Sequence, residues 1–374
     1  MVKKRLLYFT GAIILVVVVI VIFLMISNDN KKIEVLTYVQ VEHKIKEAAI
    51  LYTSVKPSLL PNTKGEVVVL TANDLASAGY MLSLNEYLGN ISCVGEAQIA
   101  LVGASYTYTS ILDCGTNYKT LFLYEKLLEN IVVKGPGLYQ MIDGKFTYGD
   151  FANDSDSVKY IFRGEDPNNY LLMDGEYWRI VEVDSNYNLL LIKNSLLYNG
   201  TGRVWDDRYN KEVGYSFGIN EYSMSRIRDN LLSFYKYAGS FLKESILPLS
   251  MCISSRGMND SVSNFEFECS KRFDEDYVGL LTVSQFISAT VDKDCLNISD
   301  ISCGNYNYLS SLGSSWWLLN SPGGNTCSMY YVNGNVIKSD ITSASYAVRP
   351  VVLVSKSLKY VSGDGTILNP YIVR

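Results

Sequence analysis

Histidine is nearly absent from this chain: His43 is the only one among 374 residues, and none of the seven cysteines belongs to a Cys-x-x-Cys pair. Structural zinc sites need such clusters of cysteine and histidine, so no zinc site is predicted. A hydrolase triad needs a histidine near its nucleophile, whereas His43 adjoins Glu42 on the polar side of a predicted helix. General acid–base chemistry would fall to carboxylates, and no pair of them stands out. The sequence therefore predicts no catalytic residue, metal or cofactor.

Two matches to catalytic motifs lack the context that those motifs require. Residues 214–218 read Gly-Tyr-Ser-Phe-Gly, the G-x-S-x-G of a nucleophile elbow, but the preceding residues 205–213 do not form a buried strand pattern. Ser233–Lys236 and Ser240–Lys243 fit S-x-x-K, yet the companion K-T-G and S-D-N sequences are absent. We expect a glycine-rich loop in the first case and chance matches on a helix in the second.

Basic residues are outnumbered by acidic ones, 33 to 38. Three basic residues and no acidic ones precede residue 6, so the rest of the chain carries 30 basic against 38 acidic residues, a net charge of −8. A surface of this sign disfavours nucleic acid as a partner. Tyrosine, by contrast, is abundant, with 29 residues. This favours half-buried strands, with an aromatic surface for sugars or peptides as the alternative.

Charge is absent between Leu6 and Ile26, an apolar run of 21 residues that directly follows Lys3–Arg5. A helix of this length spans the ~30 Å core of a bilayer. The run is longer than the apolar part of a signal peptide and is not followed by a small-residue cleavage site, although a removed signal peptide is the alternative. We expect residues 1–30 to form a cytoplasmic tip and a membrane anchor in the lipid bilayer. The basic residues before the span place the N-terminus in the cytoplasm and the remaining chain outside the cell.

All seven cysteines follow the apolar run, on the side of the membrane where disulfides persist. Their proximity in the sequence suggests three pairs, the first of which flanks a predicted hairpin. Cys327 is left over and is either free and buried or an intermolecular link. The predicted disulfides are Cys93–Cys114, Cys252–Cys269 and Cys295–Cys303.

Residues 31–125 are predicted to form the first region outside the membrane. Apolar residues recur at intervals of three and four between Glu34 and Val55, which predicts an amphipathic helix that Pro57 ends. We expect this helix to pack on its own domain, with a coiled-coil seam as the alternative. A strand, a helix capped by Thr71 and a hairpin follow at 65–70, 71–79 and 97–112.

This arrangement resembles type IV pilins and pseudopilins, in which a basic N-terminus and a long apolar helix lead into an amphipathic helix and a small β unit. The resemblance covers residues 1 to about 120. Prepilins carry Gly-Phe-Thr-Leu-Ile-Glu at the start of the helix, whereas the nearest sequence here, Leu7–Ala12, has neither that glycine nor the glutamate. The resemblance implies an anchored stalk, with a subunit of a pseudopilin-like assembly as an alternative.

Residues 126–374 are predicted to form an α+β head domain. Asp-Gly or Asn-Gly lies between strand-forming residues at three places, which is a strong hairpin signal. Two amphipathic helices and a terminal strand are also predicted. Pro350 marks a bulge or an edge position in that strand. The hairpin turns are 143–144, 174–175 and 333–334; the helices begin at Ser223 or Ser225 and within 278–289; the terminal strand is 346–354.

Several stretches of this region resemble a C-terminal domain of unknown function common in surface proteins of low-GC Gram-positive bacteria. They follow the same order over some 210 residues. The order of hairpins, helices and a Trp-Trp strand is also similar to the C-type-lectin-like and formylglycine-generating-enzyme folds. The resemblance implies a C-type-lectin-like head without an established activity. The matching stretches are 160–164, 167–170, 177–180, 278–281, 316–317, 348–351, 363–366 and 369–371.

Trp316 and Trp317 are the densest aromatic point of the head. Alternation along a strand turns one indole inward and leaves the other free to face outward. With Tyr330 they are the candidate ligand-binding residues, and burial in the core is the alternative. Two acidic clusters, 274–276 and 292–294, contain oxygen ligands suited to calcium but lack EF-hand spacing, so solvated charge is the favoured interpretation.

These observations predict a single-pass, membrane-anchored cell-surface protein of bacterial type. Its head would be a non-enzymatic recognition or adhesion domain for an extracellular glycan or protein. The alternatives are a structural subunit of a pseudopilin-like assembly and an enzyme of unrecognised type that uses carboxylates of the head.

Overall fold

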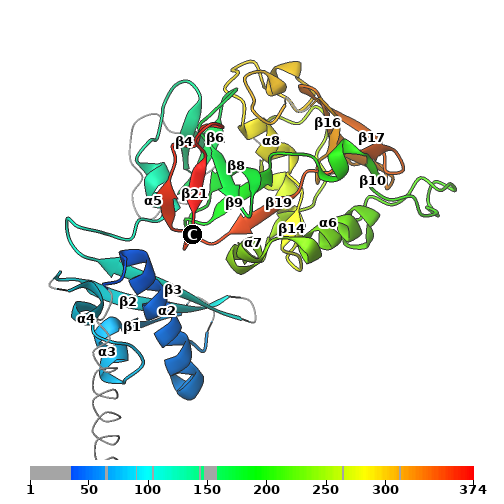
Figure 1. Cartoon of the computed structure of the whole chain (residues 1–374). Helices are drawn as coiled ribbons and strands as arrows, with labels where there is room; N and C mark the ends of the chain where they lie inside the picture. The colour runs from blue at the N-terminus through cyan, green and yellow to red at the C-terminus, as the bar shows by residue number, and fades with distance from the viewer. Residues whose placement is uncertain are drawn as a thin grey trace, which may run out of the picture. The chain divides into compact units, whose positions relative to one another are not determined.

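The computed structural model describes residues 35–374 except 64–65, 90, 103–104, 143–144, 147–157, 263–264 and 311–312. The predicted membrane span therefore lies outside the described residues. Within the described part of the chain, no helix combines the length and the apolar character needed to cross a membrane. The fold is mixed α+β and divides into two compact units, separated between Thr120 and Leu121 (Figure 1).

The first unit is organised around α2 (Tyr38–Val55), which begins with a capping box formed by Thr37 and Gln40. One side of α2 packs against a three-stranded antiparallel sheet of the described residues, in the order β1-β2-β3. The middle of the apolar stripe, Val41, Ile45 and Ala48, is buried as the spacing predicts, whereas Val55 at its end is exposed. A helix capped by Thr71 follows β1. The other elements of this unit are η1 (Pro57–Leu59), β1 (Val67–Thr71), α3 (Ala72–Ser77), α4 (Leu84–Leu88), β2 (Val94–Val102) and β3 (Ser105–Asp113).

Glu42 differs from its expected position on the polar side of α2, because only 1% of it is exposed. Its carboxylate accepts hydrogen bonds from the hydroxyl groups of Tyr118, at 2.8 Å, and Thr120. Since both donors follow β3 in sequence, the periodicity of the helix alone could not reveal that the carboxylate has partners there. His43 is exposed, as predicted.

The first helix of the second unit is α5 (Leu123–Leu128), which spans the boundary that the sequence predicts after residue 125. Leu123 and Leu127 are buried in the core of this unit, and the Leu123 N–H donates to the carbonyl oxygen of Leu358 at 2.8 Å. The unit therefore starts before residue 125, where the sequence had placed the boundary.

Eleven of the described strands form one branched sheet at the centre of the second unit (Figure 1). Its main path runs β11-β19-β9-β8-β6-β4-β5; β14 also pairs with β19, and β8 also pairs with β7, which continues to β21 and β20. The strands are β4 (Gly137–Ile142), β5 (Lys145–Phe146), β6 (Val158–Arg163), β7 (Tyr170–Met173), β8 (Glu176–Val183), β9 (Leu189–Lys193), β11 (Ile246–Leu247), β14 (Val278–Gly279), β19 (Val351–Val354), β20 (Tyr360–Ser362) and β21 (Tyr371–Val373).

Two of the predicted hairpins have turns that fit their residues. Asp174 and Gly175 join β7 to β8, and both have positive φ angles, 50° and 75°, as a type I′ turn requires. The hairpin of β16 and β17 also forms, but its loop residues are Gly334 and Asn335, one residue later than the predicted turn at 333–334, and Gly334 has a φ of 63°. The third turn, at residues 143–144, lies outside the described residues.

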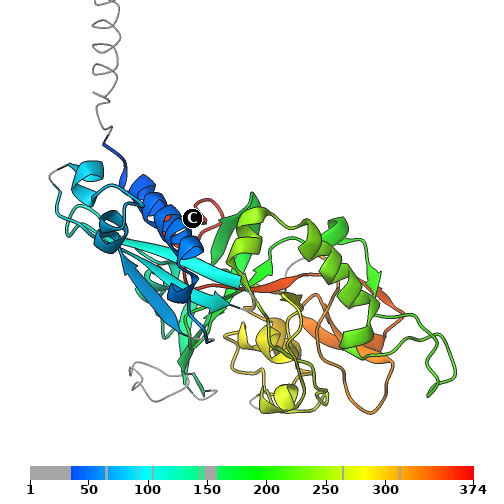
Figure 2. The same cartoon turned by 90° about the horizontal axis from the view of Figure 1, so that it is seen from below.

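Helices and three smaller sheets surround the main sheet (Figure 2). Ser225 caps α6, and Gly239 separates α6 from α7, as the sequence suggests. The helices are η2 (Leu197–Gly200), η3 (Tyr222–Met224), α6 (Arg226–Tyr237), α7 (Ser240–Ser245), η4 (Phe265–Ser270), α8 (Val283–Ser288) and η5 (Ile301–Gly304), and the strands of the smaller described sheets are β10 (Arg203–Val204), β12 (Met251–Cys252), β13 (Arg272–Phe273), β15 (Trp316–Trp317), β16 (Ser328–Asn333), β17 (Val336–Ile341) and β18 (Ser345–Tyr346).

The strand expected at 346–354 is neither terminal nor at an edge. Residues 351–354 form β19, which pairs with β9 on one side and with β11 and β14 on the other. Pro350 immediately precedes β19, a position at which a central strand does not need its missing N–H.

The described residues contain three disulfides, in the pairing that the sequence predicts: Cys93–Cys114, Cys252–Cys269 and Cys295–Cys303. The first flanks the hairpin of β2 and β3, and the other two lie in the second unit. Cys327 is free and buried, the first of the two alternatives drawn from the sequence.

Candidate functional site

The three residues predicted to bind a ligand lie in the core of the second unit. The exposed fraction of Trp316, Trp317 and Tyr330 is 0% in each case. The expectation that one indole faces outward is wrong, because both faces of β15 are covered: Phe286 packs edge-on against Trp316, and Tyr346 packs edge-on against Trp317. These side chains belong to the core and have no exposed surface that a ligand in solution could contact.

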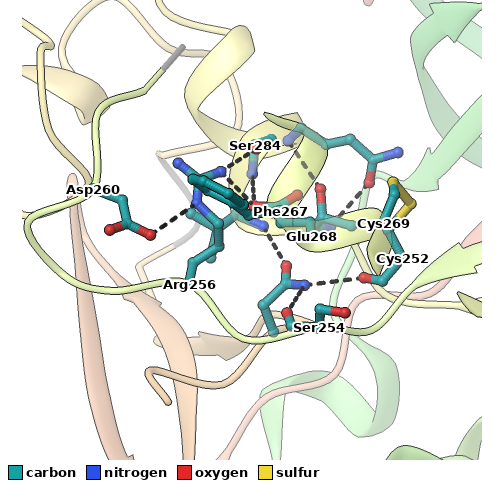
Figure 3. A network of polar contacts seen from close by, with 12 residues as sticks. Cys252, Ser254, Arg256, Asp260, Phe267, Glu268, Cys269 and Ser284 are labelled. Atoms are coloured by element: carbon teal, nitrogen blue, oxygen red, sulfur yellow. Dashed lines mark hydrogen bonds and ion pairs between the residues drawn. A yellow bond between two sulfur atoms is a disulfide. The ribbon is translucent and has the colours of Figure 1, made fainter. Parts of the chain in front are cut away.

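A buried polar network around Arg256 is joined to Tyr330, whose hydroxyl donates to the carbonyl oxygen of Arg256 at 2.7 Å. Figure 3 shows Arg256, Glu268 and Ser284 of this network. The Arg256 guanidinium is 3.1 Å from the Glu268 carboxylate, and it also donates to the Ser284 hydroxyl at 2.7 Å. Arg256 and Glu268 are 1% and 2% exposed. Nε of Arg256 has no hydrogen-bond partner among the described residues and lies 3.5 Å from the Asp260 carboxylate. Because each charge has an opposite charge beside it inside the protein, we interpret this network as structural.

Glu268 also stabilises the start of α8. Its Oε1 accepts the backbone N–H of Ser284 at 2.9 Å, in the first turn of the helix, where unpaired N–H groups favour a negative charge. Burial raises the pKa of Glu268 above its ordinary value, against the opposing effects of Ser284 and Arg256. The Cys252–Cys269 disulfide fixes the next residue of the chain (Figure 3).

The first of the two acidic clusters is also structural. Asp276 is 3% exposed and forms a two-pronged ion pair with Arg228, at 2.8 and 3.0 Å. Its carboxylate further accepts the Tyr222 hydroxyl at 3.3 Å. Within the residues that the structure describes, no group of three or more His, Cys, Asp and Glu side chains is arranged to hold a metal ion.

The second acidic cluster lines a surface pocket of about 510 Å³ in the second unit. This volume falls in the range of small-molecule sites. The walls come from three parts of the chain: the turn before β4, the residues after β6, and the loops that follow α8 and η5. The side chains that line it include Pro136, Glu165, Asp292, Lys293, Asp294 and Tyr306.

Tyr306 is the aromatic residue of this pocket. It is 60% exposed and has a φ of 45°, in the left-handed region that a bulky residue rarely adopts. Strained backbone of this kind is frequent at binding sites. The Cys295–Cys303 disulfide closes the loop before it, and Asn307 just after it is buried and donates to the carbonyl oxygens of Phe286 and Cys303 at 2.8 and 3.0 Å.

The acidic wall of the pocket is held by a chain of hydrogen bonds. The Asp292 N–H donates to the Thr290 hydroxyl, which in turn donates to the carbonyl oxygen of Asn305 at 2.5 Å. The Asp292 carboxylate accepts the Asp294 N–H at 3.0 Å and the Asn305 amide at 2.9 Å. These two hydrogen bonds lower the pKa of Asp292, and the one from Asp294 has the larger effect. The carboxylate is therefore ionised at neutral pH.

Gly164 allows the backbone after β6 to lie close to Pro136, which lines another part of the pocket. It has a φ of 106°, and a Cβ at this position would lie 2.6 Å from Cα of Pro136. Next to it, Arg163 donates from its guanidinium to the carbonyl oxygens of Ser288 and Thr290. The end of β6 is thereby joined to the loop after α8.

Three charged side chains of the pocket have no hydrogen bond or ion pair with another described residue: Glu165, Lys293 and Asp294. They are available to a ligand. With Asp292, the pocket carries three carboxylates against one ammonium group, so it repels anions. Asp292 and Asp294 belong to a cluster that the sequence singled out for calcium; Tyr306, Glu165 and Lys293 were not found, because only folding brings their loops together.

The matches to catalytic motifs are ordinary surface features. Gly214–Gly218 belongs to a loop in which Asn210 N–H donates to the carbonyl oxygen of Tyr215 at 2.9 Å, and Ser216 is exposed there. Ser233 and Ser240 are exposed on α6 and α7.

Comparisons with protein-family models, with curated proteins and with solved structures found no match. The pocket is therefore interpreted from its own chemistry.

Proposed function

We propose that the chain is a membrane-anchored cell-surface protein whose second unit is a non-enzymatic recognition domain. One observation carries the proposal: a concave pocket combines an exposed tyrosine ring with unpaired carboxylates and an ammonium group. The anchor rests on the apolar run Leu6–Ile26 and the basic residues before it.

The chemistry of the pocket selects a hydroxyl-rich ligand without negative charge, and a glycan fits best. The Tyr306 ring offers a flat surface to the apolar face of a sugar. Glu165 and Asp294 accept hydrogen bonds from hydroxyl groups, and Lys293 donates them. The role proposed for these groups is to hold a sugar ring and not to act on one of its bonds, so the proposed function is binding without catalysis.

At the level of architecture, the second unit is proposed to be C-type-lectin-like and the first a pilin-like stalk. The order of hairpins, helices and the Trp-Trp strand supports the former, and α2 on an antiparallel sheet supports the latter. The assembly alternative has less support, since Val41, Ile45 and Ala48 of the apolar stripe are buried within their own unit.

A glycan-binding screen tests the proposal on residues 35–374 produced in an oxidising compartment. Tyr306→Ala should weaken binding of any glycan found about tenfold, since an aromatic contact contributes on the order of 1.4 kcal/mol. Tyr237→Ala is the matched control, because Tyr237 is 78% exposed on α6 and does not line the pocket. The proposal fails if no glycan binds or if the two variants behave alike.

A further inference from the structure

Two buried arginines of the second unit converge on β9. Arg179 on β8 is 4% exposed and lies opposite Ile192 in the sheet register. Arg349, just before β19, is 1% exposed and donates from Nε to the carbonyl oxygen of Lys193 at 2.7 Å. Burial first, and then the nearby charge of Arg179, lower the pKa of Arg349 to about 9, against the opposing effects of Tyr308 and Tyr170.

Other arginines of this unit compensate their burial with a carboxylate, as Arg256 does with Glu268. Among the described residues, the carboxylate nearest to Arg179 is Asp166, which is 73% exposed and 3.5 Å away, and Arg349 has no carboxylate partner. The cluster is therefore a concentration of positive charge in a region of low dielectric, which is costly without an anion.

The same cluster contains buried donors that have no partner among the described residues: Nη1 of Arg349, the hydroxyl of Tyr308 and Nε1 of Trp316. They belong to two pairs of stacked side chains, and Tyr308 and Arg179 both act electrostatically on Arg349. The Arg179 guanidinium lies over the Tyr308 ring, 4.8 Å from its centroid, and the Arg349 guanidinium is 5.6 Å from the centroid of a Trp316 ring. Buried donors of this kind normally have acceptors.

We propose that Arg349, Arg179 and Tyr308 form an internal binding site for a small monovalent anion, chloride, within the core of the second unit. All the unpartnered groups are donors, which selects an acceptor without hydrogens of its own. The Tyr170 and Tyr308 rings lie 3.7 and 4.8 Å from the Arg179 guanidinium, and a monatomic ion is the smallest anion that these donors could share. The bound anion stabilises the fold and is independent of the recognition pocket.

Thermal unfolding of the full-length protein in non-ionic detergent tests the proposal. Tryptophan fluorescence reports on the second unit alone, because all four tryptophans lie in it. Replacing sodium gluconate by sodium chloride at equal ionic strength should raise the melting temperature by about 2–4 °C at a few times the dissociation constant, and bromide should act similarly. Equal melting temperatures in the two salts would overturn the proposal.

Tyr308→Phe assigns the effect to this cluster. It removes one unpartnered hydroxyl and keeps the ring, so the protein should fold and should lose at least half of the chloride-dependent shift. Tyr222→Phe is the matched control: Tyr222 is equally buried, but its hydroxyl donates to protein acceptors, so this variant should keep the whole shift. A Tyr308→Phe protein that keeps the whole shift would contradict the site.

Discussion

Arg256 and Glu268 meet in the core of the second unit, where neither side chain has contact with water to compensate its charge. A buried pair of this kind contributes little over a pair of apolar residues, but the loss of one partner leaves the other charge buried and uncompensated. The two residues also link the loop after β12 to the first turn of α8.

Glu268→Gln should therefore lower the free energy of unfolding by about 3–5 kcal/mol. Urea unfolding followed by tryptophan fluorescence measures this change. Glu275→Gln is the control, because Glu275 is 74% exposed and lies 3.6 Å from Arg228; it should change stability by no more than about 0.5 kcal/mol.

A double variant, Arg256→Met with Glu268→Leu, should recover more than half of that loss, since it removes both charges. A loss of less than about 1 kcal/mol in Glu268→Gln would contradict the expected cost of leaving Arg256 buried without its carboxylate partner.

Single residues show where the sequence was insufficient. Trp316 and Trp317 are adjacent, and alternation predicts opposite environments, but a strand covered on both faces buries both. Glu42 and Tyr306 depend on partners distant in sequence. By contrast, the exposed His43 and the three disulfide pairs follow from local pattern and spacing.

Among the elements, the turn between β7 and β8 has a second role. Asp174 accepts the backbone N–H of Leu242 on its Oδ2 at 2.8 Å, and so caps α7 from a different part of the chain. Gly239, at the start of α7, has no side chain to cap the helix, and a Cβ there would lie 2.1 Å from Asp174 Oδ2. The break between α6 and α7 is thus fixed by a contact with the sheet.

Asp174→Ala should destabilise the protein by about 2 kcal/mol, because alanine is unfavourable at positive φ and cannot cap α7. Asp174→Asn keeps both properties and should cost less than about 1 kcal/mol. Urea unfolding of the two variants separates the explanations. Equal losses would mean that the negative charge, rather than the turn and the cap, is what matters.

Elements marked by local chemistry were predictable, and their neighbours in space were not. Asp174-Gly175 identified its hairpin, and Thr71 and Ser225 identified helix starts, because turns and caps depend on nearby residues. Pro350 predicts a bulge or an edge position, whereas it directly precedes β19, which is central, since the neighbours of a strand are set by segments far apart in sequence. The pocket is assembled from several loops in the same way.

At the scale of the whole molecule, each of the three described disulfides joins residues of the same unit, and each unit has a hydrophobic core of its own. The pocket proposed for recognition is lined entirely by residues of the second unit. From this organisation we predict that the second unit folds without the first and, if the proposed function is right, binds without it.

The binding activity of residues 121–374 alone tests this account most directly. Produced in an oxidising compartment, this segment should unfold in one cooperative transition within a few degrees of that of residues 35–374, as tryptophan fluorescence reports. In the glycan screen it should bind the same ligands with the same affinity within about twofold, and Tyr306→Ala should weaken that binding as it does in the longer chain. A folded segment that binds nothing, while residues 35–374 bind, would contradict the account.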